Sequence, residues 1–192
     1  EQKVGQFSHR GTLIHLIDLP GTYSLTANSE EERIAREYII RERPDVVVAV
    51  VDAAILERSL YLLAELLALS VPVVLALNMM DVAIQEGIQI EPRVLKAALG
   101  IPVIPMSAAK AQGVEQLADI VTRLARGEIE YDPNVPRIRP DHRVLLDQIE
   151  NEITEYVPSP YPTSWIALKL LEGDSKVTKL IRTHLPEQRW QR

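Results

Sequence analysis

The segment VPVVLALNMMD, residues 71–81, decides how the rest of the chain is read. Residues 71–77 are apolar and rich in β-branched side chains, which is typical of a short buried strand. The run ends at Asn78, and Asp81 follows after two methionines. In an open parallel sheet, ligands bind beyond the carboxyl ends of the strands. The segment therefore predicts a buried strand with candidate binding residues at its tip.

Three further apolar runs follow the same design, at residues 13–17, 46–51 and 101–104. Each is followed closely by a polar residue, namely Asp18, Asp52 and Ser107. Helical patterns separate the runs: Ser29 starts one with three glutamates behind it, and others cover 56–69, 92–99 and 114–124. This alternation predicts an α/β fold, a mostly parallel sheet with helices on both faces. Residues 3–9 add a strand, paired with 13–17 as an antiparallel hairpin.

The character of the chain changes at Tyr131, where a proline-rich linker begins. After it, residues 141–157, 162–173 and 175–185 are predicted helices without strands between them. We therefore expect an α/β domain over residues 1–130 and a small all-helical domain over 137–192, which docks on the first domain or is truncated. Residues Trp165, Leu168, Leu171 and Trp190 are expected in the helical core.

Composition excludes several classes of function. The net charge of −6 argues against nucleic-acid binding driven by phosphate neutralisation. The absence of cysteine excludes disulfides, thiolate metal sites and a cysteine nucleophile. No apolar run reaches the ~18 residues of a membrane span, and the four histidines have no metal-ligand spacing. Because the chain begins with Glu1, we expect it to be a piece of a longer protein.

The residues Asp18-Leu19-Pro20-Gly21 suit a sensor of a terminal phosphate. A carboxylate at a strand end can hold a water of Mg²⁺, which keeps much of its hydration shell. Gly21 would let a backbone N–H approach a phosphate, because no Cβ stands in the way. The alternative is an ordinary strand-to-turn signal, since Asp and Gly both favour turns.

The residues Asn78-Met79-Met80-Asp81 suit recognition of guanine. A carboxylate here can accept hydrogen bonds from the N1–H and 2-amino groups of guanine, which adenine cannot offer. A site built this way rejects adenine because buried polar groups would lose their partners, at about 1–3 kcal/mol each. The alternative is that Asp81 caps a helix beginning at Val82.

The third cluster is Ser107-Ala108-Ala109, where small residues would let a backbone N–H meet the guanine carbonyl oxygen. The alternative is an ordinary loop. The three clusters follow one another at strand ends, at offsets of 60 residues (78 − 18) and 29 residues (107 − 78). This joint order favours a guanine-nucleotide site more than any cluster does alone.

These motifs give the chain its resemblance to a known family. The matching stretches are LIDLPGTYSL at 16–25, VVDA at 50–53, LERSLYL at 56–62, ALNMMD at 76–81 and YPTSWIALKLLEGD at 161–174. Together they resemble the cytoplasmic GTP-binding and helical domains of the bacterial ferrous iron transport protein B family. Met79 stands where most GTPases carry a lysine, and its polarizable chain could cover the base as the lysine stem does.

The resemblance implies a GTP/GDP switch, with Mg²⁺, on the cytoplasmic side of an inner-membrane protein that transports Fe²⁺. Its partner would be the membrane-embedded portion of the same polypeptide, and a homo-oligomer is a further possible assembly. Carried over, Asp18 and Gly21 sense phosphate, with Asp18 reaching Mg²⁺ only through water. Residues 78–81 read guanine, the loop from Ser107 supports the base, and residues 22–32 form the second switch.

One part of the expected site is missing from the sequence. None of the eight glycines precedes Lys-Ser or Lys-Thr, so the phosphate loop is absent. We therefore expect this chain alone to bind GTP poorly and hydrolyse it negligibly. In the family, the strand before that loop lies between the strands predicted at 13–17 and 46–51. Here those strands should face a gap or pair directly.

No catalytic residue is assigned. Thr22 stands after Gly21, where many GTPases place a glutamine that orients water, and threonine is too short to reach in the same way. A second hypothesis therefore stays open, that the isolated chain is a non-catalytic interaction or scaffold module. A dinucleotide-dependent oxidoreductase is disfavoured because the chain lacks G-x-G-x-x-G.

Overall fold

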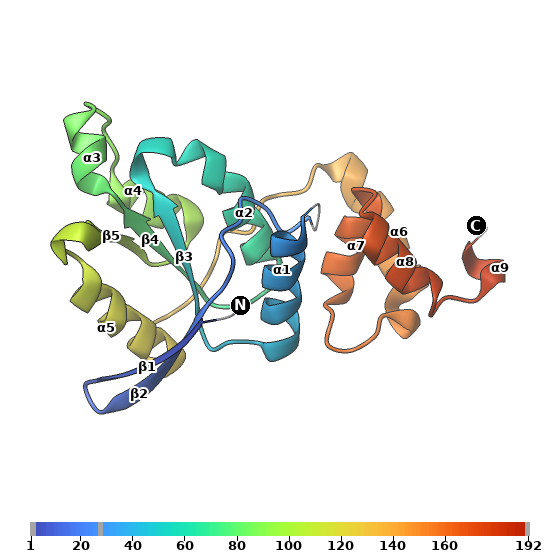
Figure 1. Cartoon of the computed structure of the whole chain (residues 1–192). Coiled ribbons are helices and arrows are strands. Elements are labelled where there is room, and N and C mark those ends of the chain that lie inside the picture. Colours follow the sequence, from blue (N-terminus) through green and yellow to red (C-terminus); the bar gives the residue numbers. More distant parts are fainter. Residues whose placement is uncertain (1–2, 27–28, 191–192) are drawn as a thin grey trace.

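The computed structural model describes residues 3–26 and 29–190 of the chain (Figure 1). The strands are β1 Lys3–His9, β2 Thr12–Asp18, β3 Val47–Asp52, β4 Val73–Asn78 and β5 Val103–Pro105. The α-helices are α1 Glu30–Glu42, α2 Glu57–Ala68, α3 Met80–Gln85, α4 Pro92–Leu99, α5 Val114–Ala125, α6 Pro140–Ile153, α7 Thr163–Leu171, α8 Ser175–Arg182 and α9 Glu187–Trp190. Short 3₁₀ turns add η1 Ala53–Ile55, η2 Ala108–Lys110 and η3 Thr154–Tyr156.

The central sheet is parallel and runs in the order β3-β4-β5. Its middle strand, β4, is fully buried from Val73 to Leu77 because helices cover both faces. Val73, Leu75 and Leu77 pack in the larger core with α1 and α2. Val74 and Ala76 point the other way, into a smaller core closed by α5. The predicted fold class, a parallel sheet with helices on both faces, is confirmed.

The hairpin of β1 and β2 forms a separate antiparallel sheet. Its two-residue turn, Arg10 and Gly11, has positive φ at both positions (46° and 76°), as a tight hairpin turn requires. No ladder joins β2 to β3 in the part of the chain that the structure describes. Of the two expectations for these strands, the gap is therefore observed and direct pairing is not.

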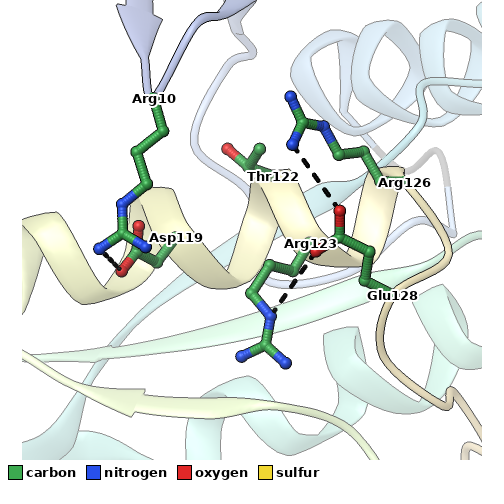
Figure 2. A pocket seen from close by; sticks show the side chains of 6 residues that line it. All are labelled: Arg10, Asp119, Thr122, Arg123, Arg126 and Glu128. Atoms are coloured by element: carbon green, nitrogen blue, oxygen red, sulfur yellow. Dashed lines mark ion pairs between the residues drawn. The ribbon is translucent and has the colours of Figure 1, made fainter.

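The hairpin tip lies on α5 and is held there by charges. Arg10 Nη2 lies 2.8 Å from Asp119 Oδ2, and His9 contacts the other oxygen of the same carboxylate. Figure 2 shows Arg10 reaching Asp119 on α5, with Arg123 and Arg126 one or two turns further along. These polar contacts orient the hairpin, while Val4, Leu13 and Leu16 stay exposed on it.

Local capping signals fix the ends of two helices. Ser29 caps α1 through a capping box with Glu32, which confirms the predicted start of this helix. Gly100 ends α4 at φ 68°, and a Cβ at this position would lie 2.2 Å from the carbonyl oxygen of Asp132. Only glycine fits both the backbone conformation and the close approach of the linker.

The segment after the linker is helical, as predicted, but two details differ. The predicted helix 141–157 is α6 followed by the 3₁₀ turn η3, and the short α9 was not predicted. Trp165 is buried among the helices, whereas Leu171 at the end of α7 is exposed, so its placement in the core was wrong. Leu171 falls in the last turn of α7, where the chain leaves the packed face for Gly173.

Two buried ion pairs join the helical segment to α1 and α2. Arg36 Nη1 lies 2.7 Å from Asp174 Oδ2, and Lys169 Nζ lies 2.5 Å from Glu65 Oε1. Lys169 also donates to Glu172 at 2.7 Å. Burial disfavours the charged lysine, but hydrogen bonds to Glu172 and Glu65 outweigh it, so the pKa of Lys169 is raised. The stability that this pair adds is therefore lost only at strongly alkaline pH, above the usual lysine pKa.

Replacing Lys169 by methionine should lower the free energy of unfolding by about 3–5 kcal/mol, because the Glu65 carboxylate would stay buried without its cation. Adding Glu65→Gln to Lys169→Met should recover a large part of this loss. Urea denaturation followed by circular dichroism measures both effects. Lys176→Met, which alters an exposed lysine of α8, is the control; equal effects of the two lysine variants would contradict the prediction.

Candidate functional site

The tips of β4 and β5 are joined into one edge by hydrogen bonds. Asn78 Oδ1 accepts from the backbone N–H of Ala108 at 3.0 Å. The N–H of Met106 donates to the carbonyl of Leu77 (2.8 Å), and the N–H of Met80 donates to the carbonyl of Met106 (3.1 Å). The loops after these two strands, which the sequence analysis singled out separately, are therefore joined by hydrogen bonds.

Asp81 lies in the first turn of α3 and points toward the loop after β5. Its Oδ2 is 2.9 Å from Lys110 Nζ, and its side chain is one-quarter exposed (24%). Hydrogen bonds from Lys110 and then from the hydroxyl of Ser107 hold the pKa of Asp81 below its usual value. The expected neighbourhood of Asp81 and Ser107 is thus present in the structure.

The alternative interpretation of Asp81 as a helix cap is wrong. Helix α3 begins at Met80, and Met79 is its N-cap residue in a left-handed conformation (φ 60°, ψ 30°). The sequence analysis raised a helix here only in that alternative, and placed its start at Val82, because six residues are too few to show a helical period. The left-handed turn leaves the Met79 side chain 39% exposed beside the strand tips.

The loop from Ser107 to Gln112 is compact. The N–H of Ser107 donates to the carbonyl of Gln112, and the N–H of Gln112 donates back to Ser107. Between them, Ala108 to Lys110 make the 3₁₀ turn η2, which ends at Ala111 with φ 54°. Ser107 is buried, while Ala108, Ala109 and Lys110 are exposed, so the loop presents its backbone and the lysine outward.

The other two tip carboxylates occupy different settings. Asp52 faces Asn78 in the register of β3 and β4, and its Oδ1 caps η1 by accepting from Ala54 N–H at 2.8 Å. Asp18 ends β2 in the separate hairpin, where it is exposed and pairs in register with Lys3. Within the described residues, no strand ladder brings Asp18 beside Asn78.

The segment after Asp18 is anchored further along the chain. Leu19 and Pro20 are half-buried, Gly21 is exposed, and Leu25 is fully buried. The N–H of Leu25 donates to Glu65 Oε2 at 2.5 Å, and its carbonyl accepts from Arg36 Nη1 at 3.3 Å. Of the segment 22–32 that the resemblance assigns to the second switch, residues 27–28 lie outside the described residues.

The described part of the chain also contains two cavities. One of about 540 Å³ is lined by residues 53–58 with Ile88 and Ile90, beside the start of α2. Arg58 of its wall stacks over the Tyr23 ring at 3.7 Å, a contact that no sequence pattern signalled. The other, of about 360 Å³, is the arginine-rich pocket under the hairpin tip in Figure 2. Neither is lined by Asn78, Asp81 or Ser107.

Neither a metal site nor a membrane-spanning helix is found in the described residues. Over residues 3–26 and 29–190, no three side chains of His, Asp or Glu are grouped so that they could hold a metal ion. In the same part of the chain, every helix is too short or too polar to cross a bilayer.

Comparison with known proteins adds to this geometry. Residues 1–121 match the family described as ferrous iron transport protein B, and residues 144–191 match the FeoB cytosolic helical domain. The chain belongs to the ferrous iron transport protein B (FeoB) family. The resemblance drawn from residues 16–25, 76–81 and 161–174 is confirmed.

Relatives show how much of a FeoB protein is present. The Escherichia coli (strain K12) Fe(2+) transporter FeoB is 40% identical over 181 residues, which are 91% of this chain and 22% of that protein. The chain therefore spans about one-fifth of the length of the curated relatives it matches. The cytosolic domain of T. maritima FeoB in a GDP form has a TM-score of 0.88 at 33% identity, covering 97% of this chain and 73% of that one. The FeoB G-domain from Methanococcus jannaschii has a TM-score of 0.64 at 48% identity, covering 66% and 81%.

The contacts of Asp81 predict its titration. In the native chain, the pKa of Asp81 should lie below that of an ordinary aspartate. The stability that the ionised Asp81 contributes is therefore present above the pKa of the unfolded chain. It is lost as the pH falls through the lower pKa of the folded chain. Lys110→Met should raise the pKa of Asp81 toward the ordinary value. Carboxyl-detected NMR titration measures this, with Lys96→Met on α4 as the control. An unchanged Asp81 pKa in Lys110→Met would contradict the geometry.

Proposed function

We propose that this chain is the guanine-nucleotide-binding cytosolic part of a ferrous iron transporter, and that it acts as a GTP/GDP switch. The observation that carries the proposal is the cluster of Asp81, Ser107 and Asn78 at the joined tips of β4 and β5. The T. maritima relative in its GDP form supports it, because that chain shares the fold over 97% of this one.

The cluster fits the edge of guanine. The Asp81 carboxylate, held ionised, would accept from the N1–H and the 2-amino group of the base. The backbone N–H of the exposed Ala109 would face the guanine carbonyl oxygen, and the bond from the Ala108 N–H to Asn78 Oδ1 keeps that loop in place. Met79, exposed beside the tip, would cover one face of the ring.

The phosphate side is only partly supplied by this chain. Asp18 and Gly21 are exposed at the end of β2, in keeping with a role in sensing a terminal phosphate and a water of Mg²⁺. The backbone cradle and lysine of a phosphate loop are not in the sequence. Mg²⁺ would neutralise phosphate charge when bound, and the described residues provide no cluster for its direct coordination.

We further propose that residues 1–130 form the nucleotide-binding unit and that residues 137–192 pass its state to the membrane-embedded portion of the same polypeptide. Leu25 supports this division of work. Its N–H is held by Glu65 and its carbonyl by Arg36, and each of these is ion-paired to the helical segment. A shift of the segment after Gly21 would therefore disturb both interdomain pairs. Fe²⁺ is the substrate of the transporter in this scheme, and this part stays on the cytoplasmic side of the inner membrane.

Asp81→Asn should change which base is bound. In the full-length protein, affinity for GTP should fall about 10- to 100-fold, since two donors of guanine lose their anionic acceptor at ~1–3 kcal/mol. Affinity for xanthosine triphosphate should rise, because the Asn amide can donate to the 2-oxo group and accept from N1–H. Equilibrium titration with fluorescent nucleotides measures both. Indifference to both bases would favour the scaffold hypothesis.

The chain of residues 1–192 alone should bind GTP more weakly than micromolar and show negligible hydrolysis. The reason is that most of the attraction to a triphosphate comes from the phosphate loop and the metal ion. Titration of labelled GTP against the isolated chain checks this, with the full-length protein as the positive control. Micromolar binding by the isolated chain would contradict it.

A further inference from the structure

Lys110 is the cation that contacts the proposed base-reading carboxylate. It ends η2, its Nζ lies 2.9 Å from Asp81 Oδ2, and its side chain is half exposed (51%). The two residues are 29 positions apart, and the joined loops after β4 and β5 bring them together. The sequence analysis assigned Lys110 no role, because the loop interpretation of residues 107–109 accounted for the small residues only.

A guanine edge and the Lys110 ammonium require the same group. Two N–H donors of the base approach both oxygens of the carboxylate side by side, in the plane of the carboxylate. The ammonium already takes Oδ2, and the Ser107 hydroxyl contributes a further hydrogen bond to Asp81. A base whose two donors lie in this plane therefore competes with the ammonium for Oδ2.

Displacing the Lys110 ammonium from Asp81 costs little free energy because of its surroundings. Its flexible four-carbon stem is exposed, so the ammonium can move into solvent and be fully hydrated there. An exposed pair of this kind is weak and is screened by salt. The pair is thus strong enough to compete with a base and too weak to block it.

We propose that Lys110 is a specificity residue of the nucleotide site. It competes with the base for Asp81, which lowers the affinity for guanine and lowers the affinity for adenine by a larger factor. This inference rests on the proposed function. Guanine replaces the lost lysine contact with two donors of its own, whereas adenine has an acceptor at N1 and no 2-amino group. A base that displaces Lys110 without replacing its contact leaves the carboxylate unpaired.

The test uses guanosine, which is uncharged, so phosphate contacts do not enter. In the full-length protein, Lys110→Met should tighten guanosine binding by about two- to fivefold, the range expected for loss of an exposed ion pair. Adenosine should gain more than guanosine, so that discrimination between the two falls. Lys110→Gln should act in the same direction, and Lys96→Met should leave both affinities unchanged. Isothermal titration calorimetry or competition with a fluorescent nucleoside measures the constants.

Salt provides a second readout. Raising ionic strength from roughly 0.05 to 0.5 M should tighten guanosine binding to the parent protein, because the Lys110–Asp81 pair is screened. The same change should leave Lys110→Met nearly unaffected. A purely structural role for Lys110 would not give this difference.

The outcomes separate the two proposals. Weaker or unchanged guanosine binding in Lys110→Met overturns the competition, while the guanine site itself stands if Asp81→Asn still exchanges guanosine for xanthosine. If Asp81→Asn leaves both nucleosides unaffected, the proposed function fails, and the role of Lys110 fails with it.

Discussion

The structure depends on the complete burial of β4. Helices cover both faces of this strand, and its residues from Val73 to Leu77 are shielded from water. Buried peptide groups must be hydrogen-bonded, so β4 needs a partner on each edge, and β3 and β5 supply them in parallel. Parallel pairing sets the carboxyl ends of all three strands at one edge. Asn78, the first polar residue after the buried run, therefore emerges where the loop after β5 can bond to it.

A second constraint comes from charges that are buried between the two parts of the chain. Arg36 and Lys169 are almost inaccessible, and each is paired with a carboxylate across the interface. Such pairs add little net stability compared with apolar contacts, because both ions lose their hydration. Each pair nevertheless requires its two side chains to lie at contact distance, because a misplaced partner would leave a buried charge without a counter-ion. These pairs therefore fix the position of the interface. Two of their four side chains, Glu65 and Arg36, also hold the Leu25 peptide.

Much of the architecture could be predicted because its signals are local. The strands at β2, β3 and β4, the capping box at Ser29 and the stop at Gly100 follow from periodicity, cap chemistry and glycine conformation. The failures occurred where local signals were weak or tertiary packing overrode them. Helix α3 is short and starts from a left-handed Met79, so Asp81 was weighed as its cap, although it lies inside the first turn. Leu171 has the composition of a core residue, yet the end of α7 exposes it.

The amino-acid sequence by itself determined the α/β class, the order of the tip residues Asp18, Asn78, Asp81 and Ser107, and the FeoB resemblance. These depend on neighbours along the chain, where side-chain period and turn chemistry act. Only the tertiary structure decided that Lys110 lies on Asp81, and that Arg36 meets Asp174 across 138 residues. It also decided that the hairpin rests on α5, apart from the central sheet. Contacts of this kind join segments far apart in sequence, and they exist only because folding buries the strands and helices that carry them.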